Sequence, residues 1–287
     1  MVLKEIKNIY HKELDELYPK EEVDSFFYLL IDHYLQLERF VLALQPNLTL
    51  TKDEEQPLFD ALTELKLQRP VQYIMGETSF MDLDFKVNEH VLIPRPETEE
   101  LVRWIIDEVE TECTDKNSNI RILDIGTGSG CIAISLAKYL PDAQVFALDV
   151  SANALQMAKN NAALNSVKVE FIEADILEGG MFASDFHLIV SNPPYVRQLE
   201  KQEMHKNVLE HEPGLALFVS DENPLIFYEA ITKFAKHHLL EKGRLFFEIN
   251  QYLAKETEAL LLQHNFSEIE VRKDMFGNDR MTKSILA

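Results

Sequence analysis

Four consecutive residues, Asn192-Pro193-Pro194-Tyr195, have the most specific chemistry in this sequence. The two prolines lack backbone N–H donors and stiffen the chain, and a residue that precedes proline is pushed into an extended conformation. The backbone carbonyls here therefore point in fixed directions. We expect a planar NH2 group to donate one hydrogen to the Asn192 side-chain oxygen and the other to the Pro193 carbonyl, with Tyr195 packed on its face.

This arrangement would activate a nitrogen that is otherwise a poor nucleophile. The lone pair of an NH2 group attached to a carbonyl or a ring is delocalised, and two hydrogen-bond acceptors return electron density to the nitrogen. Because preorganised acceptors and a fixed orientation both lower the barrier, the nitrogen could attack an electrophilic methyl group. We therefore interpret Asn192, Pro193 and Tyr195 as catalytic and all four residues as substrate-binding. The alternative is a Pro-Pro turn after a buried strand.

A glycine-rich turn upstream predicts a cofactor site. An apolar stretch runs into Gly126, Gly128 and Gly130, where the backbone can approach a ligand closely, and then into a helix whose N-terminus adds partial positive charge. The spacing is GxGxG, whereas a dinucleotide site usually has GxGxxG. Asp149 ends the next expected strand, where it could accept hydrogen bonds from two ribose hydroxyls. Together these residues indicate an adenosine-containing cofactor; a tight turn with a helix-capping Asp149 is the alternative.

The elements that must position these motifs alternate between strand and helix from residue 120 onward. Such alternation predicts a parallel sheet with helices on both faces, a doubly wound α/β domain. The 196–223 segment has no clear strand, and loops that long are usually lids or binding surfaces. The expected strands are 121–125, 144–149, 168–173, 186–191, 244–249 and 268–272, with a last, antiparallel strand at 282–286, and the expected helices are 130–139, 152–164, 224–239 and 252–264.

The first 70 residues have a different pattern. Apolar residues recur at spacings of three and four, which predicts amphipathic helices. After Arg69-Pro70, apolar residues such as Phe80 and Phe85 alternate with acidic ones, which favours a short β-hairpin. We therefore predict a helical domain at 1–70, a β-hairpin linker at 71–93 and a domain that carries the chemical motifs at 94–287.

The composition excludes several classes of function. The 287-residue chain has 28 Lys and Arg against 49 Asp and Glu, a formal charge of −21. Such a surface repels phosphate backbones, so direct binding of nucleic acid is not expected. Cys113 and Cys131 form no disulfide framework or Cys/His cluster, so we expect a reduced, cytoplasmic protein without a metal site. The N-terminus lacks the apolar core of a signal peptide, and no apolar run reaches the roughly 18 residues of a membrane span.

Six segments of the sequence form a further pattern: RPVQYIMGE (69–77), VLIPRPETEELV (91–102), LDIGTGSGCIAI, SNPPYV, HEPGLALF (211–218) and GNDRM (277–281). In this combination the sequence resembles a known family, the protein-(glutamine-N5) methyltransferases that modify peptide chain release factors. The GxGxG and NPPY motifs are shared with other amino-methyltransferases, whereas PRPETE and RPVQYI are more specific to this family. Two departures are VSDENPLIFY after EPGLALF, where the family tends towards glycine, and EIN in place of EIG.

The resemblance implies a Rossmann-like, class I methyltransferase domain, S-adenosylmethionine as donor, and the glutamine of a release factor's Gly-Gly-Gln loop as acceptor. Asn192 would face the donor as well as the glutamine amide. The N-terminal bundle would recognise the body of the release factor. In the matching positions, the donor's methionine part would be held by Gly126, Thr127, Gly128, Ser129 and Gly130. Its ribose would be bound by Asp149 and its adenine by Asp175 and Ile176. The glutamine amide would be held by Asn192, Pro193, Pro194 and Tyr195.

Two other functions stay open on the sequence alone. An adenine-N6 nucleic-acid methyltransferase would share NPPY, but it would need a base-flipping pocket and a basic face. A non-catalytic binding module of the same fold is the other. Arg95 could be an interdomain anchor or a pocket residue, and one of the acids at 97–100 could reach the donor's amino group. His205 and His211 are interpreted as solvent-exposed rather than catalytic.

Overall fold

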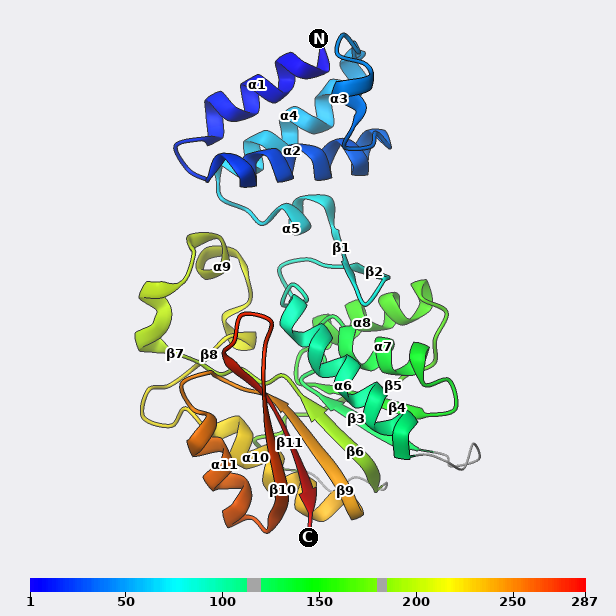
Figure 1. Cartoon of the computed structure of the whole chain (residues 1–287), viewed down its shortest axis with the longest axis vertical. Helices are drawn as coiled ribbons and strands as arrows, with labels where there is room; N and C mark the ends of the chain where they lie inside the picture. Colours follow the sequence, from blue (N-terminus) through cyan, green and yellow to red (C-terminus); the bar gives the residue numbers. More distant parts are fainter. Residues whose placement is uncertain (113–119, 180–184) are drawn as a thin grey trace. The chain divides into compact units, whose positions relative to one another are not determined.

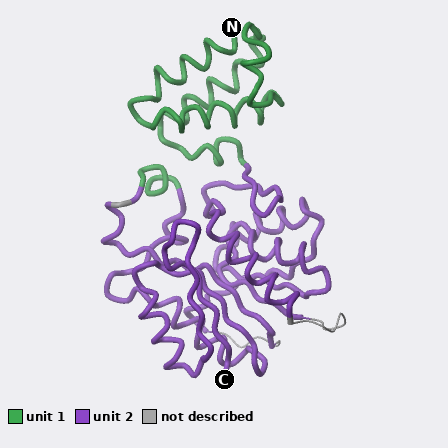
Figure 2. The backbone as a smooth tube through the Cα atoms, in the orientation of Figure 1, with its two compact units in different colours: residues 1–76, 205–211 green, residues 77–204, 212–287 purple. Residues whose placement is uncertain are grey.

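The computed structural model describes residues 1–112, 120–179 and 185–287. The chain forms two compact units (Figure 2): residues 1–76 with 205–211, and residues 77–204 with 212–287. Cys113 lies outside the described residues. In the described part of the chain, no helix combines the length and the apolar character that a membrane crossing requires.

The first unit is helical, as the apolar spacing predicts. Thr51 caps α4 in a capping box, since its hydroxyl and the Glu54 carboxylate bind each other's backbone amides. The Tyr10 hydroxyl donates to the Leu58 carbonyl inside the core. The helices are α1 (Leu3–Leu14), α2 (Lys20–Leu35), α3 (Val41–Leu44), α4 (Lys52–Lys66) and α5 (Val71–Met75), joined by α9 (Lys206–His211) from much later in the chain.

The predicted hairpin exists, but it is shorter than the 71–93 range and belongs to the second unit. Residues 71–75 are helical, and the hairpin consists of β1 (Glu77–Phe80) and β2 (Leu83–Lys86). Its two turn residues, Met81 and Asp82, both have positive φ, as a type I′ turn requires. Asn161 in α8 accepts from the Lys86 amide and donates to the Lys86 carbonyl. The hairpin is thereby fixed to the α/β core.

The second unit is built around a seven-stranded sheet in the order β10-β11-β9-β6-β3-β4-β5 (Figure 1). The β9-β6-β3-β4-β5 part is parallel, and β11 runs antiparallel to both β9 and β10. The expected bounds of β3, β4 and β6 and the antiparallel last strand are confirmed. The strands are β3 (Arg121–Ile125), β4 (Gln144–Asp149), β5 (Glu170–Glu173), β6 (Phe186–Ser191), β9 (Leu239–Glu248), β10 (Phe266–Lys273) and β11 (Asp279–Leu286).

Helices cover both faces of this sheet (Figure 1). Successive residues of one strand enter different cores: Ile122 packs in the cluster with α6 and α7, and Leu123 packs in the cluster with α10 and α11. The fold is therefore doubly wound, and its apolar strands are buried on both sides. The helices are α6 (Pro96–Glu112), α7 (Cys131–Tyr139), α8 (Ala152–Leu164), α10 (Ile226–His238) and α11 (Ala254–Gln263).

The 196–223 segment has more structure than the sequence pattern indicates. It contains a parallel pair of two-residue strands, β7 (Val196–Arg197) and β8 (Phe218–Val219), and the short 3-10 helices η1 (Gln198–Glu203) and η2 (Gly214–Ala216). Two-residue strands are too short to produce an alternating pattern. The prediction of no strand there was therefore wrong, although no long strand exists.

Candidate active site

A cavity of about 250 Å³ lies at the carboxyl ends of β3, β4 and β6. The strand order reverses direction at this point, because the chain proceeds from β3 to β4 and β5 on one side and places β6 and β9 on the other. Ligands of open α/β sheets bind at such switch points. Three of the segments that line the cavity are residues 125–129, 148–151 and 191–194. The fold therefore brings the glycine turn, the Asp149 turn and the Asn-Pro-Pro motif to one cavity.

The glycines of the turn divide into two roles. Gly126, Thr127, Gly128 and Ser129 line the cavity. Gly130 does not line it: a Cβ there would lie 2.8 Å from the Ile134 side chain. Gly130 permits close packing of α7 and α8, and the expectation that it also holds the cofactor stays a prediction.

The buried carboxyl group of Asp124 holds the glycine turn in place. Asp124 Oδ2 accepts from the Thr127 hydroxyl at 2.6 Å and from the Ala133 amide at 3.3 Å. Burial raises the pKa of Asp124 to about 7, and these two donors oppose the shift. Among the described residues, Asp124 Oδ1 has no hydrogen-bond partner.

Asp149 lines the cavity, and each of its two carboxylate oxygens accepts a hydrogen bond from a backbone amide. Oδ2 accepts from the Gly128 amide at 2.8 Å, and Oδ1 accepts from the Ser151 amide at 2.9 Å. Burial raises the pKa of Asp149, against these amide donors. Asp175 and Ile176 line the same cavity. The acid therefore holds the glycine turn in place, and each oxygen keeps a lone pair for a further donor.

The first three residues of the Asn-Pro-Pro-Tyr motif line the cavity, and the fourth contacts a residue beside it. Asn192, Pro193 and Pro194 line the cavity, and Tyr195 does not. The Tyr195 hydroxyl donates to Glu248 Oε1 at 2.9 Å, and burial raises the pKa of Tyr195 well above its ordinary value. The hydroxyl of Tyr195 is thus fixed on Glu248, and the expectation that its ring packs on the bound NH2 group stays a prediction.

Two residues that sequence reasoning missed contact this motif. Thr98 lines the cavity, accepts from Asn192 Nδ2 at 3.3 Å and donates to Glu248 Oε2 at 2.6 Å. Glu248 is buried, and this burial raises its pKa. A sequence signal existed, because Thr98 belongs to PRPETE and Glu248 to EIN. In the sequence, Thr98 lies between two acids, Glu97 and Glu99, whose charges are the more obvious feature.

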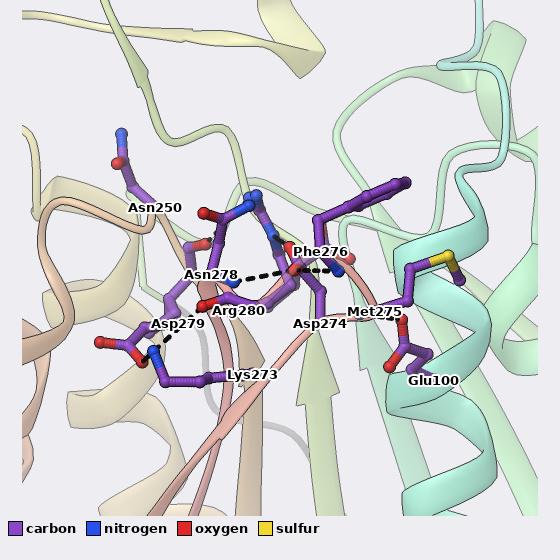
Figure 3. A network of polar contacts seen from close by, with 12 residues as sticks. Glu100, Asn250, Lys273, Asp274, Met275, Phe276, Asn278, Asp279 and Arg280 are labelled. Atoms are coloured by element: carbon purple, nitrogen blue, oxygen red, sulfur yellow. Dashed lines mark hydrogen bonds and ion pairs between the residues drawn. The ribbon is translucent and has the colours of Figure 1, made fainter.

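A polar network at the β10–β11 turn is built around Asp274 and Arg280 (Figure 3). Arg280 donates through Nε to Asp274 Oδ2 at 3.0 Å and through Nη1 to the Tyr195 hydroxyl at 3.5 Å. The buried Asp274 accepts from the amides of Phe276 and Asn278 through Oδ1. The turn that follows β10 is thereby anchored to the Tyr195–Glu248 pair.

None of the acids Glu97, Glu99 and Glu100 lines the cavity, and two of them bind backbone amides. Glu99 accepts from the Met81 amide at 2.8 Å, and Glu100 accepts from the Met275 amide at 3.0 Å. Arg95 does line the cavity, and its Nη2 donates to the buried Glu212 Oε1 at 2.6 Å. Of the two roles left open for Arg95, its position favours the pocket.

The two loop histidines lie apart from this cavity. His205 is exposed, and His211 Nε2 donates to the Leu67 carbonyl at 3.0 Å within the first unit. Neither lines the cavity. Within the described residues, no group of three or more His, Cys, Asp or Glu side chains is arranged to hold a metal ion.

Comparison with known proteins connects this geometry to a family. A model described as a methyltransferase small domain matches residues 108–214, and one described as a PrmC N-terminal domain matches residues 10–76. The 16S rRNA N2 G1207 methyltransferase of Thermus thermophilus, solved with AdoMet and guanosine, has a TM-score of 0.51 at 17% identity, over 74% of this chain and 50% of that one. This likeness concerns the fold, a class I, Rossmann-like methyltransferase domain.

Two relatives extend the match to nearly the whole chain. The release factor glutamine methyltransferase of Flavobacterium psychrophilum is 52% identical, over 99% of both chains. The release factor glutamine methyltransferase of Bacteroides thetaiotaomicron is 40% identical, over 94% of this chain and 95% of that one. At such identity and coverage the catalytic and N-terminal parts are shared together. This chain belongs to the family of release factor glutamine methyltransferases.

Proposed function

We propose that this protein transfers a methyl group from S-adenosylmethionine to the side-chain amide nitrogen of the glutamine in the Gly-Gly-Gln motif of peptide chain release factors. One observation carries the proposal: residues 126–129 and 192–194 line the same cavity. A donor bound at the glycine turn and an amide bound at the Asn-Pro-Pro motif would therefore be adjacent. Membership of a family whose members are named release factor glutamine methyltransferase supports the same substrate.

The residues of the glycine turn fit a cationic donor that contains adenosine. Cβ atoms at Gly126 and Gly128 would meet nothing within 4 Å, so a ligand can approach the backbone there. Asp149 would accept from the ribose hydroxyls, and Asp175 with Ile176 would face the adenine. The carboxylate of Asp149 would favour a positively charged ligand.

The acceptor site would hold the glutamine amide by its two N–H hydrogens. Asn192 Oδ1 and the Pro193 carbonyl would accept one hydrogen each and fix the nitrogen towards the donor. Bound S-adenosylmethionine would supply an electrophilic methyl group on a sulfonium sulfur and would leave as the neutral thioether that keeps the electron pair of the carbon–sulfur bond. Asn192 and Pro193 would hold the amide while its nitrogen bonds to the methyl carbon and gives up one N–H proton to water.

Mass spectrometry of a folded release factor after incubation with the protein and donor tests this proposal. We expect one added methyl group on the glutamine of Gly-Gly-Gln and none on a factor in which alanine replaces that glutamine. A parallel reaction contains duplex DNA as acceptor. An unmodified factor, or methylated adenine in the DNA, would contradict the proposal.

Asn192→Ala tests the role of the amide clamp. Loss of one preorganised acceptor should lower the methyl-transfer rate by roughly 10²-fold or more at saturating donor and factor. Donor affinity, measured by calorimetry, should change much less. Asn160→Ala on the exposed face of α8 is the control and should keep the normal rate. Near-normal turnover of the Asn192 variant would refute the clamp.

A further inference from the structure

We propose that Thr98 and Glu248 are positioning residues that determine which way the Asn192 carboxamide faces. The inference rests on the proposed function, because it concerns the group that would bind the glutamine amide. A carboxamide has an acceptor oxygen on one side and a donor NH2 on the other. Only the orientation that presents oxygen to the cavity can accept a hydrogen from a substrate NH2 group.

The Thr98 hydroxyl has one proton, and the structure assigns it to Glu248. Thr98 Oγ1 and Glu248 Oε2 are 2.6 Å apart, the distance of a hydroxyl that donates to a carboxylate. With its proton used there, Thr98 Oγ1 can only accept at its other contact. That contact is Asn192 at 3.3 Å, so the Asn192 atom that faces Thr98 must be the NH2 nitrogen. This conclusion follows from the donors and acceptors and does not depend on which atom is drawn as nitrogen.

Glu248 accepts the Thr98 hydrogen bond at Oε2, as an ionised carboxylate does. Its second oxygen accepts from the Tyr195 hydroxyl at 2.9 Å, so both oxygens act as acceptors. The positive charge of Arg280 lowers the pKa of Glu248, against the larger effect of burial. The Tyr228 hydroxyl donates to the Glu248 backbone carbonyl, which holds the residue at the end of β9. Glu248 thus acts on Asn192 through Thr98 and does not line the cavity itself.

The other face of the Asn192 carboxamide is available for substrate. Asn192 lines the cavity, and within the described part of the chain its Oδ1 atom has no hydrogen-bond donor. Without the Thr98 hydroxyl, the carboxamide could rotate and present its NH2 group instead. Two NH2 groups would then face each other, and the substrate amide would lose one of its two acceptors.

Three single variants test this inference. Thr98→Val removes the hydroxyl and keeps the shape, Thr98→Ser keeps the hydroxyl, and Thr232→Val is a matched control. Thr232 is buried in α10 away from the cavity lining, and among the described residues its hydroxyl has no partner. The assay measures kcat and KM with a folded release factor, donor affinity by calorimetry and thermal unfolding.

We expect Thr98→Val to lower kcat by about tenfold or more. KM for the factor and donor affinity should stay within about twofold, because one amide contributes little to a large protein interface. Thr98→Ser should stay within about threefold of the normal kcat, and Thr232→Val should match the unmodified protein. A normal kcat in Thr98→Val, or an equal loss in Thr98→Ser, would overturn the inference.

Glu248→Gln provides a second test if Thr98→Val is poorly folded. Glutamine keeps the side-chain volume but offers one acceptor oxygen for two hydroxyl donors, so kcat should fall while donor affinity persists. An unchanged kcat would overturn the inference. If the unmodified protein does not methylate the folded factor, the proposed function fails instead, and the two failures are thereby distinguished.

Discussion

Two glycines of the same turn, Gly128 and Gly130, are required for different physical reasons. Gly128 lines the cavity, and a side chain there would meet nothing within 4 Å. Gly130, two positions later, lies against Ile134 and Ala158 of the packed helices. Both have positive φ, so neither position suits an ordinary side chain.

Replacing each glycine with alanine should distinguish a role in helix packing from a role in donor binding. Gly130→Ala combines a φ of +83° with a Cβ at 2.8 Å from Ile134 Cδ1 and 3.0 Å from Ala158 Cβ. We expect it to lower the free energy of unfolding by about 2–4 kcal/mol. Gly128→Ala should lower it by about 1 kcal/mol but weaken donor binding more. Urea unfolding without donor and calorimetry with donor measure the two effects, and equal loss of stability would argue against this division.

Asp124 should make stability depend on pH. Its pKa is about 7 in the folded protein against an ordinary value of 3.8, so the folded state binds more protons between these values. Stability from Asp124 is therefore complete below the ordinary pKa and is lost as pH rises towards 7. Asp124→Asn stays neutral at every pH. Relative to the unmodified protein, its free energy of unfolding should rise by roughly 2 kcal/mol between pH 5 and pH 8. A constant difference across this range in urea unfolding would exclude the shifted pKa.

At the scale of elements, Asn250 connects the end of β9 to the segment that follows the Asn-Pro-Pro-Tyr motif. Its Nδ2 donates to the Tyr195 carbonyl at 3.0 Å and to Glu200 Oε2 at 2.9 Å. Asn250 and Glu200 are both buried. Asn250 thus connects the Tyr195 carbonyl and η1 to the end of β9.

Asn250→Ala should loosen β7 and η1. Without the amide, the Tyr195 carbonyl and the buried Glu200 each lose a donor, which should lower the free energy of local opening by about 1–3 kcal/mol. Hydrogen exchange of the backbone amides in 196–203 should become faster, while exchange in β3 and β4 should not change. Unchanged exchange in 196–203 would show that the Arg197 pair with Glu200 suffices on its own.

At the scale of the molecule, the chain contributes to its first unit twice. Residues 205–211 belong to that unit together with 1–76, and His211 donates to the Leu67 carbonyl. A deletion of residues 1–70 would remove the partners of this segment. The role of the N-terminal helices is therefore better tested by changing the substrate than by shortening the protein.

A folded release factor should be a much better substrate than a short peptide that contains Gly-Gly-Gln. The 1–76 helices line no part of the cavity and are proposed to bind the body of the factor. Binding energy far from the reacting amide positions it, so a truncated substrate should lose rate as well as affinity. We expect kcat/KM to be lower for the peptide by at least about 10²-fold. Equal rates for both substrates would remove the proposed role of the first unit.

Much of the fold and part of the site could be predicted because their causes are local in sequence. Alternation of apolar strand and helix specified β3, β4 and β6 to the residue, and glycine spacing specified the turn at 126–130. Two prolines after a strand specified the rigid segment at 193–194. The carboxyl ends of parallel strands meet at one edge, which brought these motifs together.

Only the tertiary structure determines which residues hold the side chains of the site in place. Thr98 and Glu248 are 150 residues apart and share a hydrogen bond only because α6 and β9 pack together. Tyr195 belongs to the motif by sequence, yet its hydroxyl binds Glu248 beside the cavity. Gly130 shares a pattern with Gly126 and Gly128, but the helices packed around it determine its role. Spacing along the chain specifies backbone conformation and strand ends, whereas the partner of a buried polar side chain depends on which distant elements pack against it.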